Sequence, residues 1–512
     1  MVSNKDRAAI TWYNILIVAF VTIAAAGYAW TNAIIGTTLG QPSFLKYFHL
    51  DTASNATDLI STMNGLFQAG GFFGSLAASP VADRWGRKPC LGVAAVIMII
   101  SNALLAGSVH VAMFITFRFF SGFAAFFTLT VVTVWMSEVV PPAIRGTVME
   151  MLTVGFVVGY VGASWTGFGF YFWQTDNESE WRPPLAIGCF FPLVFLAGLR
   201  WVPESPRYLV TKDRHDEARA VLERLHRGKD SADVSFAHAE LYQIKKQTAI
   251  ERTLQSSWAA MFKRPSYRKR CFYAMGYIVI TQCIGELVIN NYSPSLYAGL
   301  GYGPVKQLLY FSAWITQSIG LVVIAMILVD RFPRPQYMAF GVLFSEVCLS
   351  IYTAIIAIYG ETLENKAALR AAVAILFIYL FPVIVFLDGL LFIYVAELFP
   401  NHLRAKGTSL GIATFCLTNI IWLQSAPTGF KNIGWKYYLC LIIPGTIGGL
   451  ILWNFFPDTK GVPLEELAAL FGDEDEVAIY QSEIEVNKNT GEVAENRHEH
   501  KAEKVVYVES VV

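Results

Sequence analysis

The chain has 512 residues, of which 54% are hydrophobic and only 15% are charged. Soluble domains carry about 25% charged residues, so this composition excludes an ordinary soluble enzyme. Lys+Arg and Asp+Glu are equal at 39 each, and no basic excess indicates a nucleic-acid partner. The seven cysteines form no CxxC motif and the histidines show no ligand spacing, so we expect no disulfide scaffold, no metal site and no cofactor.

Twelve long apolar segments follow one another along the chain. Each is close to the roughly 20 residues that a helix needs to cross the hydrocarbon core, and none alternates as a barrel strand would. The sequence therefore predicts an all-α membrane protein with 12 transmembrane helices, the first of them a retained anchor. The segments cover about 14–37, 61–82, 91–108, 112–137, 147–173, 184–202, 271–293, 307–329, 337–359, 372–396, 408–426 and 437–456.

Loop charges predict the orientation. With the N-terminus inside, the inner loops hold 25 Lys/Arg and the outer loops hold 7, which satisfies the positive-inside rule. Both termini are then cytoplasmic, and we expect the plasma membrane as the location. Two glycosylation sequons, at Asn55 and Asn177, fall on the predicted outer side, where glycosylation requires them.

The segments divide into two groups of six, separated by a polar loop with helical spacing. The last part is acidic, with 14 acidic and 5 basic residues, and we expect it to be solvated and largely disordered beyond Gly472. The predicted parts are a cytoplasmic N-terminus (1–13), an N-terminal six-helix bundle (14–202), a cytoplasmic helical linker (203–270), a C-terminal six-helix bundle (271–456) and a cytoplasmic tail (457–512).

The two halves repeat weakly. DRWGRK at 83–88 recurs as DRFPRP at 330–335, and Glu138 with Arg145 recurs as Glu397 with Arg404. A unit of about 250 residues used twice is typical of a two-bundle transporter, whose substrate binds near the membrane midplane between the bundles.

The motifs resemble those of the sugar porter branch of the major facilitator superfamily, in its fungal form, over about residues 14–470. They are DRWGRK (83–88), RFFSG (118–122), SEVVP with Arg145-Gly146 (137–146), PESPRYL (203–209), ELFP with RAKG (397–407) and FPDTKG (456–461). The resemblance implies that a monomer moves a small solute by rocking two bundles around a central site.

These motifs lie at predicted cytoplasmic helix ends, where acids and bases can pair when the inner side is closed and separate when it opens. The alternative is that they only fix topology and helix ends. Arg118 and Glu150 are assigned to the same network. The predicted inner gate consists of Asp83, Arg84, Arg87, Glu138, Arg145, Glu204, Arg207, Asp330, Arg331, Glu397 and Arg404.

The predicted pocket departs from the family pattern. Proton-coupled relatives carry an acid after Gly-Tyr on the first helix, but here the residue is Ala29. Thr153 and Thr281 stand where sugar-contacting glutamines are usual, and Leu287 stands in place of an asparagine, although Gln282 and Asn419 are kept. Since each buried hydroxyl left unpaired costs about 1–3 kcal/mol, this pocket is less suited to an ordinary sugar.

Two acids are gained inside predicted spans, Glu286 and Asp388, and acids at this depth indicate a solute pathway or a proton relay. Asp388 shares a helix face with Phe392. Leu287 takes the ligand-facing position, so Glu286 is expected to point about a quarter-turn away, and a structural role for it remains open. Glu346 is expected to be structural. The predicted substrate-binding residues are Gln282, Glu286, Asp388, Phe392, Asn419, Thr153 and Thr281.

We therefore predict a transporter of a sugar or sugar-like solute that works by alternating access, as a uniporter or an H+ symporter. Two alternatives remain open at this stage. One is a transporter of a non-sugar metabolite or organic acid, and the other is a sensor that binds solute without moving it. No nucleophile–base pair or cofactor loop supports an enzyme.

Overall fold

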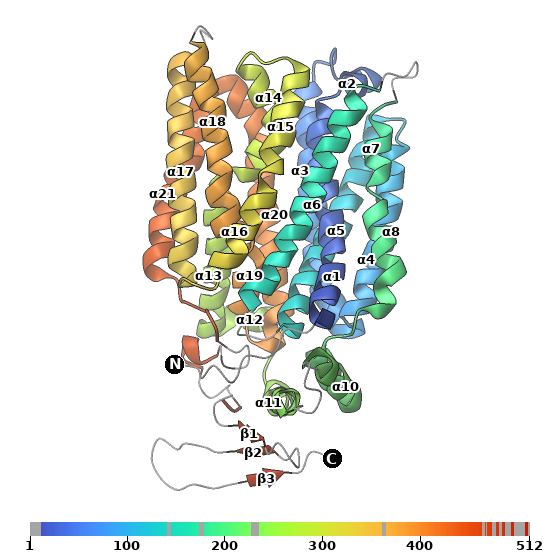
Figure 1. The fold of residues 1–512 in the computed structure, drawn as a ribbon, viewed down its shortest axis with the longest axis vertical. Coiled ribbons are helices and arrows are strands. Elements are labelled where there is room, and N and C mark those ends of the chain that lie inside the picture. The colour runs from blue at the N-terminus through green and yellow to red at the C-terminus, as the bar shows by residue number, and fades with distance from the viewer. Residues whose placement is uncertain are drawn as a thin grey trace.

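The structure is a computed structural model of the chain. It describes residues 12–140, 145–173, 179–226, 235–360, 365–462, 466, 468–473, 478–480, 484–486, 493–495 and 507–509. Long helices stand side by side in two groups, the N-terminal half and the C-terminal half of the chain (Figure 1).

The N-terminal half contains six membrane helices, the last of them interrupted. They are α1 (Trp12–Leu39), α3 (Ala56–Trp85), α4 (Arg87–Ala106), α5 (Val111–Val139), α6 (Arg145–Tyr171), and α7 (Arg182–Ile187) followed by α8 (Phe190–Gly198) and the 3-10 turn η2 (Leu199–Trp201). A short helix, α2 (Pro42–Tyr47), covers one end of this half (Figure 1).

The C-terminal half also contains six membrane helices, three of which are interrupted. They are α13 (Pro265–Gln282) with α14 (Glu286–Gly299), α15 (Pro304–Thr316) with α16 (Ser318–Leu328), α17 (Arg334–Tyr359), α18 (Lys366–Val383) with the π-helical η3 (Ile384–Asp388) and α19 (Leu391–Glu397), α20 (Asn401–Ile433), and α21 (Tyr437–Phe455). A 3-10 turn, η4 (Gly434–Lys436), joins the last two.

Length and hydropathy support the membrane assignment. Within the described residues, ten helical stretches are long and apolar enough to cross a membrane, and one of them, Asn401–Phe455, contains both α20 and α21. The 30-residue α3 completes the set of twelve. The prediction of a twelve-helix, two-bundle membrane fold is confirmed.

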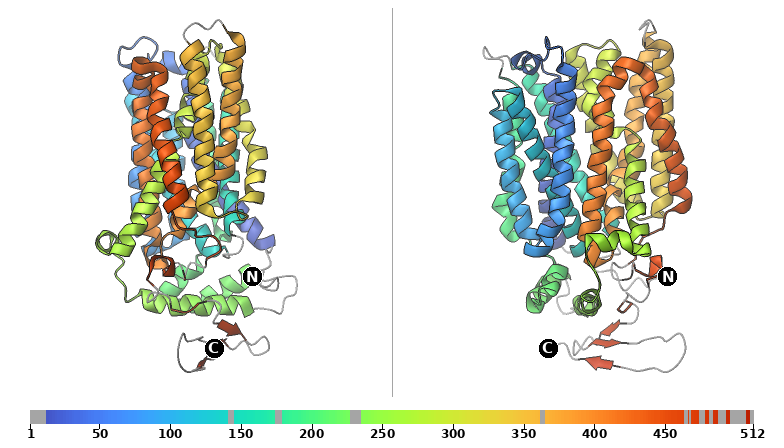
Figure 2. Two further views of the ribbon diagram at one scale, coloured as in Figure 1. Left: turned by 90° about the vertical axis from the view of Figure 1, so that its left-hand side faces the viewer. Right: turned by 180° about the vertical axis from the view of Figure 1, so that it is seen from behind.

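Four short helices form the linker between the halves: α9 (Pro206–Thr211), α10 (His215–His226), α11 (Ser235–Glu251) and α12 (Trp258–Lys263). Proline at the first turn of α9 lacks an N–H that the helix would leave unpaired in any case, and Ser205 caps the same turn by accepting from the Tyr208 N–H. Helices α10 and α11 lie below the bundles, at the end where α1 begins (Figures 1 and 2). We call this end the linker side.

Part of the tail packs against the linker. Asp473 is buried and pairs with Arg270 of α13 at 2.7 Å. Gln243 of α11 donates to the Ile479 carbonyl at 3.3 Å. After the turn η5 (Ala469–Phe471), three short antiparallel strands follow: β1 (Ile484–Val486), β2 (Val493–Glu495) and β3 (Tyr507–Glu509). Asp473 and Ile479 thus have partners in the body of the protein, whereas the expectation of a largely disordered tail beyond Gly472 falls mostly outside the described residues.

The halves meet along several helix pairs. Helix α3 packs along α20, α6 packs against α15 and α16, and α1 contacts α14. The main apolar core runs without interruption through both halves, from Val21 of α1 to Leu441 of α21. The two bundles therefore pack directly against each other along these helices.

Candidate functional site

A cavity lies between the two halves, midway along the helices. Its volume is about 50 Å³. A water molecule needs roughly 10–15 Å³ measured in this way, so there is room for only a few, and the bundles must part to admit a solute as large as a hexose. The lining residues are Tyr28, Phe156 and Tyr160 from the N-terminal half, and Thr281, Gln282, Ile284, Glu286, Leu287, Val383, Leu387, Asp388, Leu391, Phe392 and Phe415 from the C-terminal half.

Interrupted helices place the two acids at this cavity. Gly285 has φ 78° and ψ 21°, a left-handed conformation that glycine adopts without a Cβ penalty, and it turns the chain from α13 into α14. Glu286 is then the first residue of α14, where the helix dipole favours a negative charge. Asp388 ends the π-helical turn η3, which separates α18 from α19. Transporters commonly build their sites from discontinuous helices of this kind.

Few polar partners surround these acids. Asn290, one turn along α14, donates to Glu286 Oε1 at 3.4 Å. Gln282 accepts from the Asn419 amide at 3.0 Å, and Tyr160 accepts from the Asn32 amide at 2.7 Å. No lysine, arginine or histidine is among the described residues that line the cavity. Within the described lining, the site therefore offers carboxyl groups and hydrogen-bond acceptors without a fixed cation.

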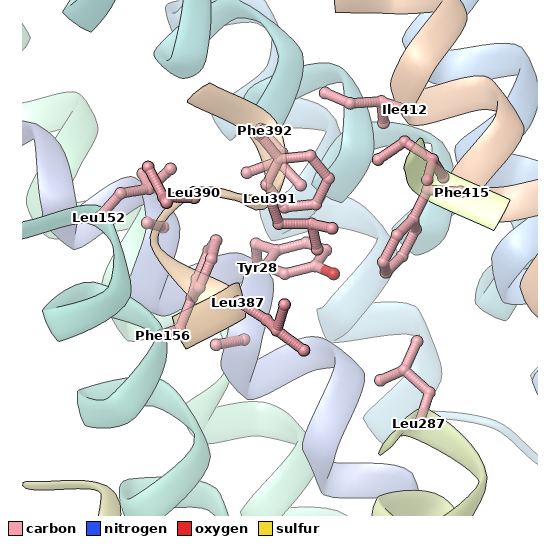
Figure 3. Packing of buried hydrophobic residues seen from close by; sticks show 14 of the residues in the cluster. Tyr28, Leu152, Phe156, Leu287, Leu387, Leu390, Leu391, Phe392, Ile412 and Phe415 are labelled. Atoms are coloured by element: carbon pink, nitrogen blue, oxygen red, sulfur yellow. The ribbon is translucent and has the colours of Figure 1, made fainter. Parts of the chain in front are cut away.

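Aromatic rings form much of the remaining wall. Figure 3 shows Tyr28 and Phe156 from the N-terminal half facing Phe392 and Phe415 from the C-terminal half. The Tyr28 and Phe156 ring centroids are 5.4 Å apart, and those of Phe392 and Phe415 are 5.5 Å apart. Such rings can stack on the apolar face of a sugar ring or of another flat solute.

The structure brings five of the seven predicted substrate-binding residues to the cavity: Thr281, Gln282, Glu286, Asp388 and Phe392. Asn419 lies behind the wall and supports Gln282. Thr153 is buried but does not line the cavity. Glu286 and Leu287 both line the cavity directly after the break at Gly285, so the expected quarter-turn between them does not take Glu286 out of the wall.

A third membrane acid, Glu150 of α6, lies against the opposite half. A Cβ added to Gly389 would lie 1.7 Å from Glu150 Oε1 and 2.1 Å from Oε2, so the carboxyl group occupies the space that a side chain at 389 would need. Glu150 is 1% exposed. The sequence assigned it to the inner-side network, whereas the structure places it directly beside the helix interruption that holds Asp388.

Two equivalent ion pairs lie on the linker side, one in each half. Arg87 Nη2 lies 2.8 Å from Glu138 Oε1, and Arg334 Nη2 lies 2.9 Å from Glu397 Oε1. All four side chains are nearly inaccessible to solvent. The predicted gate included Arg331 and not Arg334, but Arg331 is exposed and Arg334 forms this pair. The 247-residue repeat contained the signal, since it aligns Arg87 with Arg334.

Glu204 joins the linker to this network. Its carboxylate accepts from the backbone N–H groups of Arg87 (3.0 Å) and Lys88 (3.1 Å), the first residues of α4. Burial raises the pKa of Glu204, and the backbone hydrogen bonds offset that effect only in part. Arg207 donates to the Glu138 carbonyl and pairs with Glu240 of α11 at 3.7 Å.

One ion pair on the linker side joins the two halves directly. Lys406 Nζ of α20 lies 3.3 Å from Asp83 Oδ2 of α3. Lys406 was not among the predicted gate residues, although it stands in the quoted RAKG motif. The buried Arg404 instead donates to Asn401 and to the Phe399 carbonyl, within its own half. The observed pairs are therefore mostly internal to a bundle, and few of them bridge the interface.

The remaining predicted residues are dispersed. Arg84 is exposed with its guanidinium beside Trp85, and Asp330 is partly exposed.

Arg118 donates to the Thr31 carbonyl at 2.8 Å, in the half of α1 away from the linker side, so its assignment to the inner network is wrong. Asn55 is exposed at the start of α3, on the side opposite the linker. The side chain of Arg145 and all of Asn177 lie outside the described residues.

Fold and cavity together define a multi-pass membrane protein of the major facilitator type. Residues 16–471 match the sequence profile described as "Sugar (and other) transporter". The chain therefore belongs to this family of membrane solute transporters.

Similar proteins cover nearly the whole chain. It is 28% identical to the MFS-type transporter criB of Aspergillus cristatus, with 92% of this chain and 96% of criB covered. It is 26% identical to the high-affinity glucose transporter of Kluyveromyces lactis (90% and 86% covered) and 26% identical to the quinate permease of Neurospora africana (91% and 90%). The fold is similar to that of the proton:xylose symporter XylE of E. coli, with TM-score 0.77, 22% identity, and 89% and 99% covered.

Proposed function

We propose that the protein carries a sugar or sugar-like solute across the membrane by alternating access, with the cavity between the two bundles as its solute site. The observation that supports this most directly is a cavity with walls from both halves, which closes only when the bundles meet. Separation on one side at a time would expose the same residues to each face of the membrane in turn.

The cavity wall favours an uncharged, hydroxyl-bearing solute. Glu286 and Asp388 can each accept hydrogen bonds from hydroxyl groups, and aromatic rings can pack on the C–H faces of a sugar. An anion would enter beside two acids, with no lysine or arginine among the described lining residues to neutralise it, which costs free energy in a low-dielectric site. On this basis a glucose-like solute fits better than a carboxylate such as quinate.

A second candidate is a non-sugar metabolite. The similarity to criB and to quinate permeases supports it, as does the small number of amide groups at the wall, where Gln282 is partly occupied by Asn419. A sensor that binds without transporting is the third candidate. These two candidates would use the same cavity. The first would move a non-sugar metabolite across the membrane, and the sensor would move nothing.

The loop charges support an orientation with the linker, both termini and the ion pairs in the cytoplasm, and we place the protein in the plasma membrane. One chain contains walls from both halves of the cavity, which supports a monomer as the functional unit. The exposed Asn55 on the opposite side is the candidate glycosylation site.

The test begins with purified protein and a panel of D-glucose, D-xylose, polyols, quinate and aromatic metabolites, each measured for thermal stabilisation at pH 5 and pH 7.5. A ligand that binds the folded state raises its apparent stability by mass action. The stabilising compounds then enter counterflow assays in proteoliposomes.

Stabilisation and saturable counterflow by a sugar or polyol are the expected results, and Gln282→Ala should weaken both. Gly320→Ala is the matched control, because a Cβ there meets nothing within 4 Å. Stabilisation by quinate or an aromatic metabolite alone would favour the second candidate. Binding without counterflow would favour the sensor and contradict transport.

A further inference from the structure

Three acids lie inside the membrane-spanning region near the bundle interface, and the proposed transport mechanism leaves one of them, Glu150, without a role. We propose that Glu286, Asp388 and Glu150 form a proton-binding chain, leading from the cavity across the bundle interface toward the linker side. The inference rests on the proposed function, since it gives that transport a coupling ion.

The chain begins in the cavity, where Glu286 and Asp388 both form part of the wall. Glu286 stands at the start of α14 and Asp388 at the end of η3, so two separate helix interruptions bring them to one space. Each is among the charges that act on the other side chains of the cavity, including Tyr28 and Tyr160.

The second step crosses between the bundles. Gly389 directly follows Asp388, and the Glu150 carboxyl group of the other half fills the space where a Cβ of residue 389 would stand. Along α6, Glu150 precedes the cavity residue Phe156 by six positions, which is about 9 Å at 1.5 Å per residue. It follows the first residue of α6 by five positions. Glu150 thus lies between the cavity and the linker side.

Glu150 is built as a proton site and not as half of an ion pair. It is 1% exposed, and its Oε2 has no hydrogen-bond partner among the described residues. Thr153, three positions along α6, lies near enough to hydrogen-bond the carboxyl group. Burying a carboxylate is costly all the same, and binding a proton removes the charge. The charged groups that act on it are Asp388 of η3, together with Asp330 and Arg334 at the start of α17. Arg334 already pairs with Glu397 at 2.9 Å.

The other titratable groups nearby are tyrosines. Tyr277 of α13 and Tyr337 of α17 both sense the charge of Glu150. Glu286 faces Asp388 and the Tyr160 and Tyr379 hydroxyls, besides its hydrogen bond from Asn290. None of the neighbours named in this paragraph carries a positive charge that would keep a carboxylate ionised.

Transfer along the chain is a proton exchange between carboxyl groups. The O–H bond of a protonated Asp388 breaks as an O–H bond forms on the Glu150 carboxylate, so one proton and one negative charge change places and no electrons are transferred. Glu150 can lose its proton to water only when α6 separates from η3 and α19. Release is therefore tied to opening of the linker side, which is what coupled transport requires.

This chain would replace the acid that is absent at Ala29 on the first helix. Two of its three acids, Glu286 and Asp388, lie on the opposite bundle, and Asp388 ends η3 directly before Gly389, which faces Glu150. Coupling would then arise where the bundles touch and not within the first helix.

The test uses the full-length protein in lipid and requires no solute. Difference infrared spectroscopy between pH 5 and pH 8 detects the carbonyl stretch of protonated carboxyl groups. We expect Glu286→Gln, Asp388→Asn and Glu150→Gln each to remove part of the pH-dependent signal. Glu150→Gln should also shift the pH at which the remaining signal disappears, because linked sites titrate together.

Glu346→Gln is the control, since Glu346 of α17 is equally buried but lies beside Gly445 of α21. It should remove only its own contribution. A spectrum unchanged by Glu150→Gln would overturn the chain. So would a double variant, Glu150→Gln with Asp388→Asn, whose spectral change equals the sum of the changes in the two single variants. Fluorescence-detected unfolding at pH 7.5 confirms that each variant is folded before its spectrum is compared.

Transport then gives a separate measurement. In liposomes loaded with a pH-sensitive dye, the proton flux driven by D-glucose is divided by the D-glucose counterflow rate, and Glu150→Gln should lower that ratio at least tenfold. Absence of counterflow in the native protein would contradict transport of this sugar and leave the infrared result to decide the chain. Counterflow with an unchanged ratio would overturn the chain and leave the transporter standing.

Discussion

Carboxyl groups occupy two regions of this protein under opposite conditions. On the linker side, Glu138 and Glu397 are each buried against an arginine. The two carboxylate oxygens of Glu138 lie 2.8 and 3.0 Å from nitrogens of Arg87, and Glu397 Oε1 lies 2.9 Å from Arg334 Nη2. Near the middle of the helices, Glu286 and Asp388 share a cavity without an arginine or lysine among its described lining residues.

The two regions differ in whether an arginine lies beside the buried carboxyl group. A buried carboxyl group paired with arginine joins two helices, and removing one partner of such a pair is strongly destabilising. A buried carboxyl group without a cation is free to gain and lose a proton or to accept from a solute. The same residue types thus form arginine pairs at one end and the wall of a cavity at the centre.

Breaking one of these arginine pairs should have the largest effect. Arg334→Ala removes the guanidinium that lies 2.9 Å from the buried Glu397, and the expected loss in the free energy of unfolding is about 3–5 kcal/mol. Chemical denaturation or thermal unfolding in detergent measures it. The neighbouring Arg331→Ala is the matched control and should have no measurable effect, because Arg331 is exposed. Equal losses in both variants would show that the buried pair is not the source of stability.

Filling the space beside Glu150 should have the next largest effect. Gly389→Ala places a Cβ within 1.7 Å of the Glu150 carboxyl, and forcing the two apart is expected to cost about 1–3 kcal/mol. Thermal unfolding of Gly389→Ala, Gly320→Ala and the double variant Glu150→Ala/Gly389→Ala tests this. The double variant should regain much of the lost stability, while Gly320→Ala should lose little. A double variant less stable than both singles would rule out the contact.

The link between the halves should affect conformation more than stability. Lys406→Ala removes the pair with the partly exposed Asp83, and such surface pairs contribute only about 0.2–1 kcal/mol. We expect a several-fold increase in the population open on the linker side. Spin labels at Trp85 and Phe332, exposed residues of the two halves, report it as a longer distance. Lys88→Ala is the control, since Lys88 binds the Arg200 carbonyl within its own half.

The smallest effect concerns Glu204 and pH. Because burial raises the pKa of Glu204 in the folded state, ionising it stabilises the unfolded chain more than the folded one. Its contribution to stability is therefore most favourable at low pH and declines as the pH rises from the ordinary glutamate range through the raised value. Glu204→Gln should be close to the native protein in acid and gain relative stability at neutral pH. A gain in stability of Glu204→Gln that is confined to acidic pH would show that folding lowers the pKa of Glu204 and does not raise it.

The fold could be predicted to a large extent from the sequence. Twelve apolar segments, their division by a charged linker, and the repeat of DRWGRK as DRFPRP all reflect local composition and spacing, which survive without tertiary information. The repeat also contains the equivalence of Arg87 and Arg334, although the predicted gate included Arg331 and not Arg334.

The cavity was only partly predictable. Motif positions led to Gln282, Asp388 and Phe392, but the wall also contains Tyr28, Phe156 and Tyr160 from the opposite half. Which residues meet across two bundles depends on how each helix is rotated and where it is interrupted, and neither follows from the period of a single helix. The break at Gly285, after which Glu286 and Leu287 both join the wall, could not be placed from the sequence for this reason. The same limitation concealed the contact of Glu150 with residue 389.

The contact of Glu150 with Gly389 also constrains how this family of sequences can diverge. Any relative that keeps this geometry and carries a side chain at the position of Gly389 must carry a shorter residue at the position of Glu150, whatever solute it transports. The two positions lie 239 residues apart, on opposite sides of the internal repeat boundary. They should therefore vary as a pair, which would record in sequence how closely the two halves approach when the transporter is closed.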